Sequence, residues 1–224
     1  YGIEITTTGD IPAGTGLASS SAVTVGSLHA MYVFLREPVN AAQLAREACE
    51  IEIETLGKPI GIQDQYIAAF GGLRFIEFQQ NGEIVNHPIR LESRTKRRLN
   101  ESLMLFFTGV TRQADSILTE QKTNMNNSLA SLRMMKEMAY TARDELCAGN
   151  VDAFGYLLHE YWQIKKHLSS NISNGVIDDW YQAARNAGAL GGKITGAGGG
   201  GFLLLYCPLD RREAVRAALP HLRE

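Results

Sequence analysis

The chain has few cysteines, no long apolar run and no signal-like start. Its three cysteines, Cys49, Cys147 and Cys207, are an odd number, lie far apart and form no metal-type pair. Scattered thiols in apolar segments predict free cysteines and a reducing, cytoplasmic compartment. No apolar stretch is long enough to span a bilayer, and the first residues lack the basic start and apolar centre of a signal peptide. These absences favour a globular protein and no membrane partner.

An excess of charge of either sign is also missing. With 24 acidic and 22 basic side chains, the formal net charge is -2, which provides no overall attraction to nucleic acid or anionic lipid. The exception is the basic run Arg-Thr-Lys-Arg-Arg at 94–98. We interpret this run as a solvated surface linker between two domains, 1–98 and 99–224; the alternative is a site for a polyanion.

A loop of glycines and hydroxyl residues precedes the first helical pattern. It consists of Pro12, Ala13, Gly14, Thr15, Gly16, Leu17, Ala18, Ser19, Ser20 and Ser21. Backbone N–H groups that converge at a helix N-terminus favour polyphosphate, so this loop is predicted to bind a nucleotide. The alternative is an ordinary turn, in which glycine supplies a positive φ and one serine caps the helix. The loop lacks the Gly-Lys-Ser/Thr ending of a P-loop and the third glycine of the dinucleotide pattern.

A second glycine cluster, Gly191–Gly201, runs into an apolar segment that reads as a strand, Phe202–Tyr206. Ordering so many glycines costs backbone entropy, which a plain connection does not require. We therefore predict a loop whose backbone approaches a ligand closely. The alternative is a flexible linker, but this run lies between a helical pattern and a strand of one domain.

The hydrophobic periodicity predicts an α+β fold in both halves. Helices are expected at 20–35, 41–56, 113–122, 128–148, 151–168, 175–187 and 210–219, and strands at 73–78, 83–89, 103–107 and 202–207. Asn40 is expected to cap the second helix. Asn81 and Gly82 predict a hairpin turn between the first two strands.

Taken together, the two loops resemble the second and third signature motifs of the GHMP kinases. This is the family of galactokinase, homoserine kinase, mevalonate kinase and phosphomevalonate kinase. Between the loops, Gly61-Ile62-Gln63-Asp64-Gln65 is similar to the stretch that carries the catalytic aspartate in the family's sugar kinases. The resemblance implies a two-domain architecture with the active site in the inter-domain cleft. The family's first motif does not appear, so we expect the N-terminal part to be incomplete.

The resemblance also implies ATP and Mg²⁺, and it assigns roles to individual residues. Asp64 corresponds to the catalytic base, with Gly61 beside the substrate; an aspartate near a turn is otherwise a helix cap. Thr195 is expected near the transferred phosphoryl group. In the second glycine cluster, the residues expected at the nucleotide are Gly196, Ala197, Gly198 and Gly199.

The magnesium ligands that the resemblance implies are Ser20 and Glu52. Glu50-Ile51-Glu52 lies on a predicted helix, as the family's magnesium-binding glutamate does. Glu50 and Glu54 compete for the role, because only one face of a helix can point into a site. Counted back from Gly57, Glu52 lies where the family places its glutamate.

For the acceptor, the sugar branch fits better than the isoprenoid branch, because mevalonate kinases lack an equivalent of Gln63. The segments Tyr66–Gly72 and Phe106–Arg112 look most like bacterial D-glycero-D-manno-heptose 7-phosphate kinases, which phosphorylate an anomeric hydroxyl. Such a substrate needs a cation for its distal phosphate, and Arg112 is the candidate; the alternative is a surface arginine. A galactokinase-like hexose kinase, a sugar- and nucleotide-binding sensor and one half of a bifunctional polypeptide remain as other interpretations.

Overall fold

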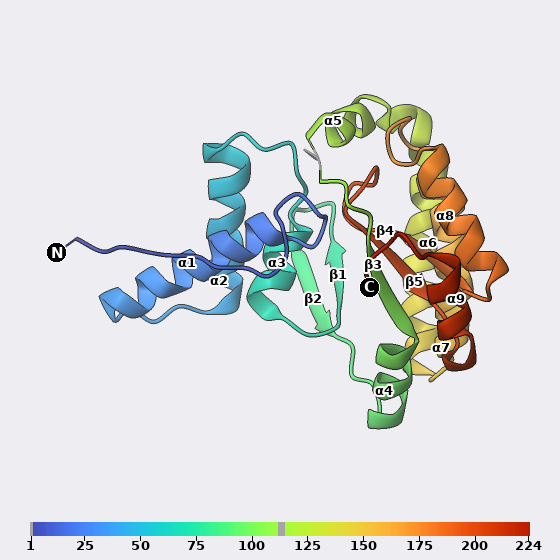
Figure 1. Cartoon of the computed structure of the whole chain (residues 1–224). Coiled ribbons are helices and arrows are strands. Elements are labelled where there is room, and N and C mark those ends of the chain that lie inside the picture. The colour runs from blue at the N-terminus through green and yellow to red at the C-terminus, as the bar shows by residue number, and fades with distance from the viewer. Residues whose placement is uncertain (1, 112–114) are drawn as a thin grey trace. The chain divides into compact units, whose positions relative to one another are not determined.

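The computed structural model describes residues 2–111 and 115–224 and combines helices with short antiparallel strands (Figure 1). Two units are distinguished by their internal contacts. The first contains the stretch up to Ala13 together with Ala18–Pro88, and the second contains Gly14–Leu17 together with Ile89–Glu224. The segment Gly14–Leu17 therefore packs with the second unit, although its neighbours in sequence belong to the first.

Helices dominate the first unit. They are α1 (Ser19–Leu35), α2 (Ala41–Cys49), the π-helix η1 (Glu50–Thr55) and α3 (Gln63–Phe70). The Asn40 side chain accepts a hydrogen bond from the backbone N of Gln43 at 2.9 Å, which confirms the predicted cap. Apolar side chains from α1 and α2 form the small core between these helices: Val25, Leu28, Leu44 and Ala48.

The second predicted helix, 41–56, changes its winding halfway along. From Glu50 onward the chain is π-helical, and the backbone N of Leu56 bonds to the carbonyl of Ile51, five residues back. The wider turn alters which side chains face inward. Glu52 is 2% exposed, whereas Glu50 and Glu54 are exposed. The acidic side chain preferred from the sequence is thus the buried one of the three.

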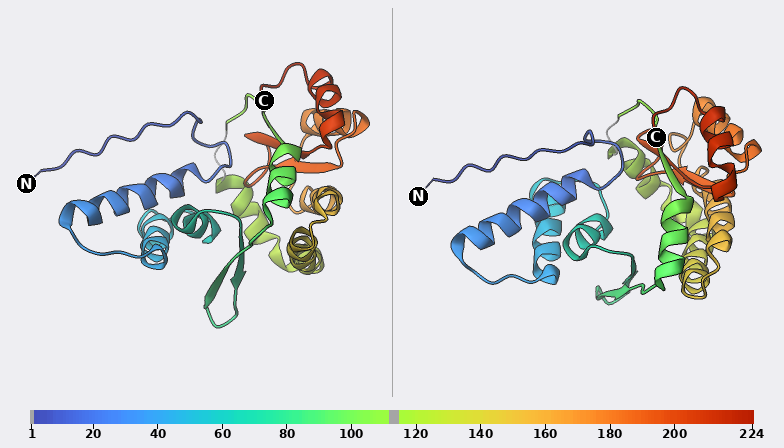
Figure 2. Two further views of the ribbon diagram at one scale, coloured as in Figure 1. Left: turned by 90° about the horizontal axis from the view of Figure 1, so that it is seen from below. Right: turned by 60° about the horizontal axis from the view of Figure 1, so that its bottom comes forward.

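The first unit ends in the predicted β-hairpin. Strands β1 (Arg74–Phe78) and β2 (Ile84–Pro88) pair antiparallel, with Phe78 opposite Ile84. Gly82 has φ +83°, and the Asn81 side chain accepts from the backbone N of Glu83 at 2.9 Å. Figure 2 shows this hairpin as a separate two-stranded ribbon that follows α3.

A three-stranded antiparallel sheet forms the centre of the second unit. Its order is β3 (Leu103–Phe107), β5 (Phe202–Tyr206) and β4 (Gly191–Ile194). In the register of β3 and β5, Met104 lies opposite Leu205 and Phe106 opposite Leu203. All four side chains are at most 1% exposed, because one face of the sheet is covered by helices.

Helices pack against this sheet and complete the core of the second unit (Figure 1). They are α4 (Ser93–Ser102), α5 (Asp115–Thr123), α6 (Leu129–Cys147), α7 (Val151–Lys165), α8 (Gly175–Asn186) and α9 (Arg212–Ala218), with short 3₁₀ turns at Met125–Ser128 and Leu209–Arg211. Helix α7 contacts β4 and β5, and α6 packs on α7. Trp162 of α7 and Ile177 of α8 lie in the same buried cluster as Met104 and Leu205.

The start of the second glycine cluster is a strand rather than a loop, which corrects the prediction. Gly191 and Gly192 belong to β4, and the loop proper is Thr195–Gly201. A Cβ on Gly191 would lie 2.7 Å from the backbone N of His159 in α7 and even closer to the carbonyl of Gly155. Only a residue without a side chain allows the strand to lie this close to the helix.

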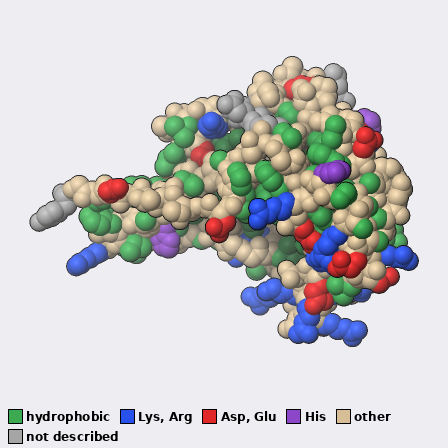
Figure 3. Space-filling model, viewed as in Figure 1, with side chains coloured by type: hydrophobic (Ala, Val, Ile, Leu, Met, Phe, Trp, Pro, Cys, Tyr) green, Lys and Arg blue, Asp and Glu red, His purple; other side chains and the backbone are tan. Residues whose placement is uncertain are grey.

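The basic run 94–98 forms part of helix α4 in the second unit, so it is not a linker. Four of its side chains, Arg94, Lys96, Arg97 and Arg98, are exposed. In Figure 3, Lys and Arg side chains gather at the lower edge, where α4 lies in Figure 1. Arg98, in the middle of α4, forms an ion pair with Asp152 in the first turn of α7 at 2.5 Å.

Candidate functional site

The predicted phosphate loop has a backbone suited to presenting N–H groups. Gly14, Gly16 and Ala18 have φ of +76°, +77° and +56°, and helix α1 begins at Ser19. Left-handed residues that alternate with ordinary ones turn successive amides towards the same side, which makes an anion-binding concavity. Among the described residues, no side chain caps α1, so no side chain takes up its first amides.

Within the second unit, the two glycine-rich segments are in direct backbone contact. A Cβ on Gly16 would lie 2.7 Å from the carbonyl oxygen of Thr195, and a Cβ on Gly196 would lie 2.7 Å from Cα of Gly16. The Thr195 hydroxyl donates to the carbonyl of Thr15 at 3.0 Å. The structure therefore brings the segment Gly14–Leu17 and the loop Thr195–Gly201 together.

Thr195 acts as a link between the two segments in this structure. Its side chain is 7% exposed, and its hydroxyl proton is used on Thr15, which is itself fully buried. A hydroxyl has one proton to donate, so donation from Thr195 to a phosphoryl oxygen requires this bond to open. Its role at the transferred group stays a prediction.

The first unit contains a buried carboxylate held by two donors. Oε2 of Glu52 accepts from the Ser21 hydroxyl at 2.7 Å and from Nε2 of Gln65 at 2.7 Å. Ser21 and Gln65 are 1% and 0% exposed. These charge-assisted bonds connect α1, η1 and α3 at one point. The sequence indicated Glu52 but not its two hydrogen-bond donors. The features that could have indicated them are the third serine of the loop, which is Ser21, and the glutamine directly after Asp64, which is Gln65.

Ser20, the serine expected to bind magnesium, makes no described hydrogen bond to Glu52. Its side chain is exposed, and its carbonyl accepts from the Thr24 hydroxyl at 3.1 Å. Successive helical residues point about 100° apart, which explains why Ser21 rather than Ser20 turns towards Glu52. Ser20 is therefore placed at the solvent side of the helix start.

The few oxygen donors present fit a magnesium ion whose remaining coordination positions are filled by substrate phosphates and water. Among the described residues there is no cluster of three or more His, Cys, Asp and Glu side chains that could hold a metal. Mg²⁺ commonly uses one or two protein oxygens together with substrate phosphates and water. Both hydrogen bonds that described residues make to the Glu52 carboxylate fall on Oε2, which leaves Oε1 for such a cation.

Asp64 lies in the first turn of α3, half-buried, and directly precedes Gln65. The N-cap of this helix is Ile62, so Asp64 is not at the capping position that an ordinary turn aspartate occupies. Gly61 is exposed just before this helix. Arg112, the predicted phosphate-gripping residue, lies outside the described ranges.

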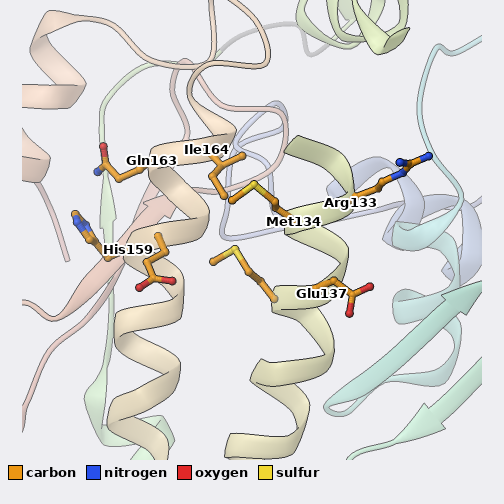
Figure 4. A pocket seen from close by; sticks show the side chains of 8 residues that line it. Arg133, Met134, Glu137, His159, Gln163 and Ile164 are labelled. Carbon is orange, nitrogen blue, oxygen red and sulfur yellow. The ribbon is translucent and has the colours of Figure 1, made fainter. Parts of the chain in front are cut away.

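A groove between α6 and α7 contains none of the predicted site residues (Figure 4). It has a volume of about 650 Å³, and Met134, Glu137 and Gln163 are among its lining side chains. His159 also lines it, and its Nδ1 lies 2.8 Å from the Tyr181 hydroxyl. Burial lowers the pKa of His159, so the ring is neutral at pH 7.

The three cysteines are free, as the sequence predicted. Burial raises the pKa of Cys49 and of Cys207 to about 11, so both thiols are protonated and unreactive at neutral pH. Of the helices that the structure describes, none combines the length and the apolar character needed to cross a membrane.

Comparison with known proteins identifies relatives over nearly the whole chain. The family model of the GHMP kinases N terminal domain matches residues 1–72, and that of the GHMP kinases C terminal domain matches residues 142–222. A D-glycero-alpha-D-manno-heptose 7-phosphate kinase from Campylobacter jejuni is 34% identical over 211 residues, which cover 93% of this chain and 62% of the relative.

Solved structures give the same result. A D-glycero-D-manno-heptose 1-phosphate kinase from Bacteriodes thetaiotaomicron superposes with a TM-score of 0.74 at 31% identity, over 94% of this chain and 59% of that one. A putative sugar kinase from Campylobacter jejuni has the same TM-score and identity, over 96% and 63% of the two chains. The chain thus spans less than two thirds of the length of these relatives. Both terminal family domains are matched in order, and the chain belongs to the GHMP kinase family.

Proposed function

We propose that this chain is the main part of an ATP-dependent sugar kinase. The observation that carries the proposal is the backbone contact between Gly14–Leu17 and Thr195–Gly201, fixed by the bond from Thr195 to Thr15. Two glycine-rich segments that touch without side chains between them offer many amides to one polyanion. A plain structural contact does not require this many positive φ angles.

The remaining tasks of phosphoryl transfer have candidate residues in the first unit. Asp64 accepts the proton of the acceptor hydroxyl, and Glu52 with Ser20 provides oxygen ligands for Mg²⁺. The metal supplies charge neutralisation for the phosphates. Ser21 and Gln65 hold the carboxylate in place, so that it needs no rearrangement when the nucleotide binds.

For the acceptor, we infer the anomeric hydroxyl of D-glycero-D-manno-heptose 7-phosphate. The names of two relatives support a heptose phosphate but place the existing phosphate differently, at position 7 in one and at position 1 in the other. Arg112 is proposed to bind the distal phosphate. The free cysteines are consistent with the proposed cytoplasmic location.

The test is an ADP-release assay on the full-length protein with ATP, Mg²⁺ and separate acceptors. Heptose 7-phosphate, heptose 1-phosphate, galactose and fucose are compared, and ³¹P NMR identifies the phosphorylated position. Turnover with heptose 7-phosphate and an anomeric phosphate in the product is the expected result. Activity on a free hexose alone indicates a galactokinase-like enzyme, and nucleotide binding without transfer to any sugar indicates a sensor.

A further inference from the structure

A lysine lies directly behind the second glycine loop. Lys165 is the last residue of α7 and is 8% exposed. Its Nζ donates to the carbonyl oxygen of Gly196 at 2.6 Å. A buried ammonium group is costly, so its location is informative. This one is placed at the loop residue whose Cα faces Gly16.

The bond from Lys165 fixes the direction of the next amide. No described peptide bond is cis, and in a trans peptide the C=O of one residue and the N–H of the next point in opposite directions. With the Gly196 carbonyl held towards Lys165, the N–H of Ala197 faces away from it. Within the described part of the chain, the amides of Ala197 and Gly198 donate to no protein acceptor.

Other amides of the same loop are used by the protein. The N–H of Gly199 bonds to the carbonyl of Ile172 at 2.6 Å, and that of Gly201 bonds to the carbonyl of Val110 at 2.8 Å. These bonds anchor the far end of the loop. Lys165 anchors its near end, and the amides left over lie between the two anchors, where a ligand can use them.

The geometry points to Lys165 as a positioning residue for nucleotide phosphates. It holds the Gly196 peptide so that the Ala197 amide is presented to an anion, and its positive charge polarises that peptide from the opposite side. This inference rests on the proposed function, because the anion is taken to be the nucleotide's terminal phosphates. The neighbouring Lys166 differs, since it pairs with Asp178 at 3.7 Å.

The test measures nucleotide affinity rather than turnover. Isothermal titration of the full-length protein gives the dissociation constants of ADP and AMP for the wild type, Lys165→Met, Lys165→Arg and the control Lys166→Met. Removal of one charge-assisted contact predicts that Lys165→Met weakens ADP binding by about tenfold or more, with AMP changed by less than about twofold. Lys165→Arg, which keeps the charge, is expected to restore most of the ADP affinity, and Lys166→Met to match the wild type.

The outcomes are distinguishable. An equal loss for ADP and AMP in Lys165→Met, or no loss, overturns the positioning role while the kinase proposal stands. A wild type that binds neither nucleotide overturns the kinase proposal itself. Should Lys165→Met fail to fold, hydrogen exchange on the wild type provides the decision: ADP is expected to protect the Ala197 and Gly198 amides, and unchanged exchange there contradicts the inference.

Discussion

Replacing Ser21 with alanine should destabilise the protein, whereas the same change at the adjacent Ser20 should leave stability nearly unchanged. Ser21 is buried and donates to Oε2 of Glu52 at 2.7 Å. Ser20 is exposed and uses only its carbonyl in the helix. The two substitutions remove the same atom from neighbouring positions of one helix, so each is the control for the other.

The expected magnitude follows from the charge on the acceptor. Hydrogen bonds to charged groups contribute about 1.5–3 kcal/mol, and a surface hydroxyl contributes within about 0.5 kcal/mol. In Ser21→Ala, Oε2 of Glu52 keeps a single donor, Gln65, in a site that is 2% exposed. We therefore expect a loss of about 2 kcal/mol for Ser21→Ala. Gln65→Met should have a similar effect, and the double variant should lose less than the sum because both changes act on one oxygen.

The measurement is urea unfolding of the full-length protein without ligand, followed by circular dichroism. A lower midpoint at unchanged slope reports the loss of stability. Wild-type stability in Ser21→Ala, or a larger loss in Ser20→Ala, would refute the described environment of Glu52. Ser20→Ala should instead raise the Mg²⁺ concentration needed for half-maximal activity, since it deletes a proposed ligand.

Three further predictions concern catalysis, packing and pH. Asp64→Asn should keep ATP affinity and lower kcat by about 10²–10⁴, the usual effect of losing a general base; wild-type kcat at saturating substrate would exclude that role. Gly191→Ala should destabilise the protein by more than about 2 kcal/mol, because the new Cβ meets the backbone of α7. The control Gly26→Ala, with open space around it, should stabilise the protein by up to about 1 kcal/mol. Thermal unfolding compares the two variants. The hydrogen bond from Ser169 lowers the pKa of Glu120 below its ordinary 4.5. Glu120→Gln should therefore be less stable than the wild type above pH 4.5, and the difference should vanish as pH falls through the lowered pKa; a difference independent of pH would contradict this.

Local sequence signals predicted the elements that depend on local chemistry. The hairpin followed from Asn81 and Gly82, the start of α1 from the serines, and β3 and β5 from their apolar runs. Strand β4 could not be predicted, because Gly191 and Gly192 have no strand preference of their own. Their conformation is set by the close approach of α7, which is a tertiary effect.

In the candidate site, too, the features set by local sequence could be predicted and those set by tertiary packing could not. The glycine loops and the preference for Glu52 could be read from the sequence, but the donors to Glu52 could not. Ser21 lies 31 positions from it, and the π-helical turn that directs Glu52 inward departs from the 3.6-residue period on which helix prediction relies. Position-specific burial and long-range hydrogen bonds appear only when the helices are packed.

The bond between Thr195 and Thr15 has a consequence for the order of assembly. Its two residues are 180 positions apart in the chain. Because a ribosome adds about 5–20 residues per second, the segment Gly14–Leu17 is synthesised roughly 10–40 s before Thr195. During that interval its backbone has none of the contacts that fix it, and closing so long a loop is slow. This segment is thus made long before it can become ordered, so a nascent chain acquires its proposed ligand site only after the loop Thr195–Gly201 has been synthesised.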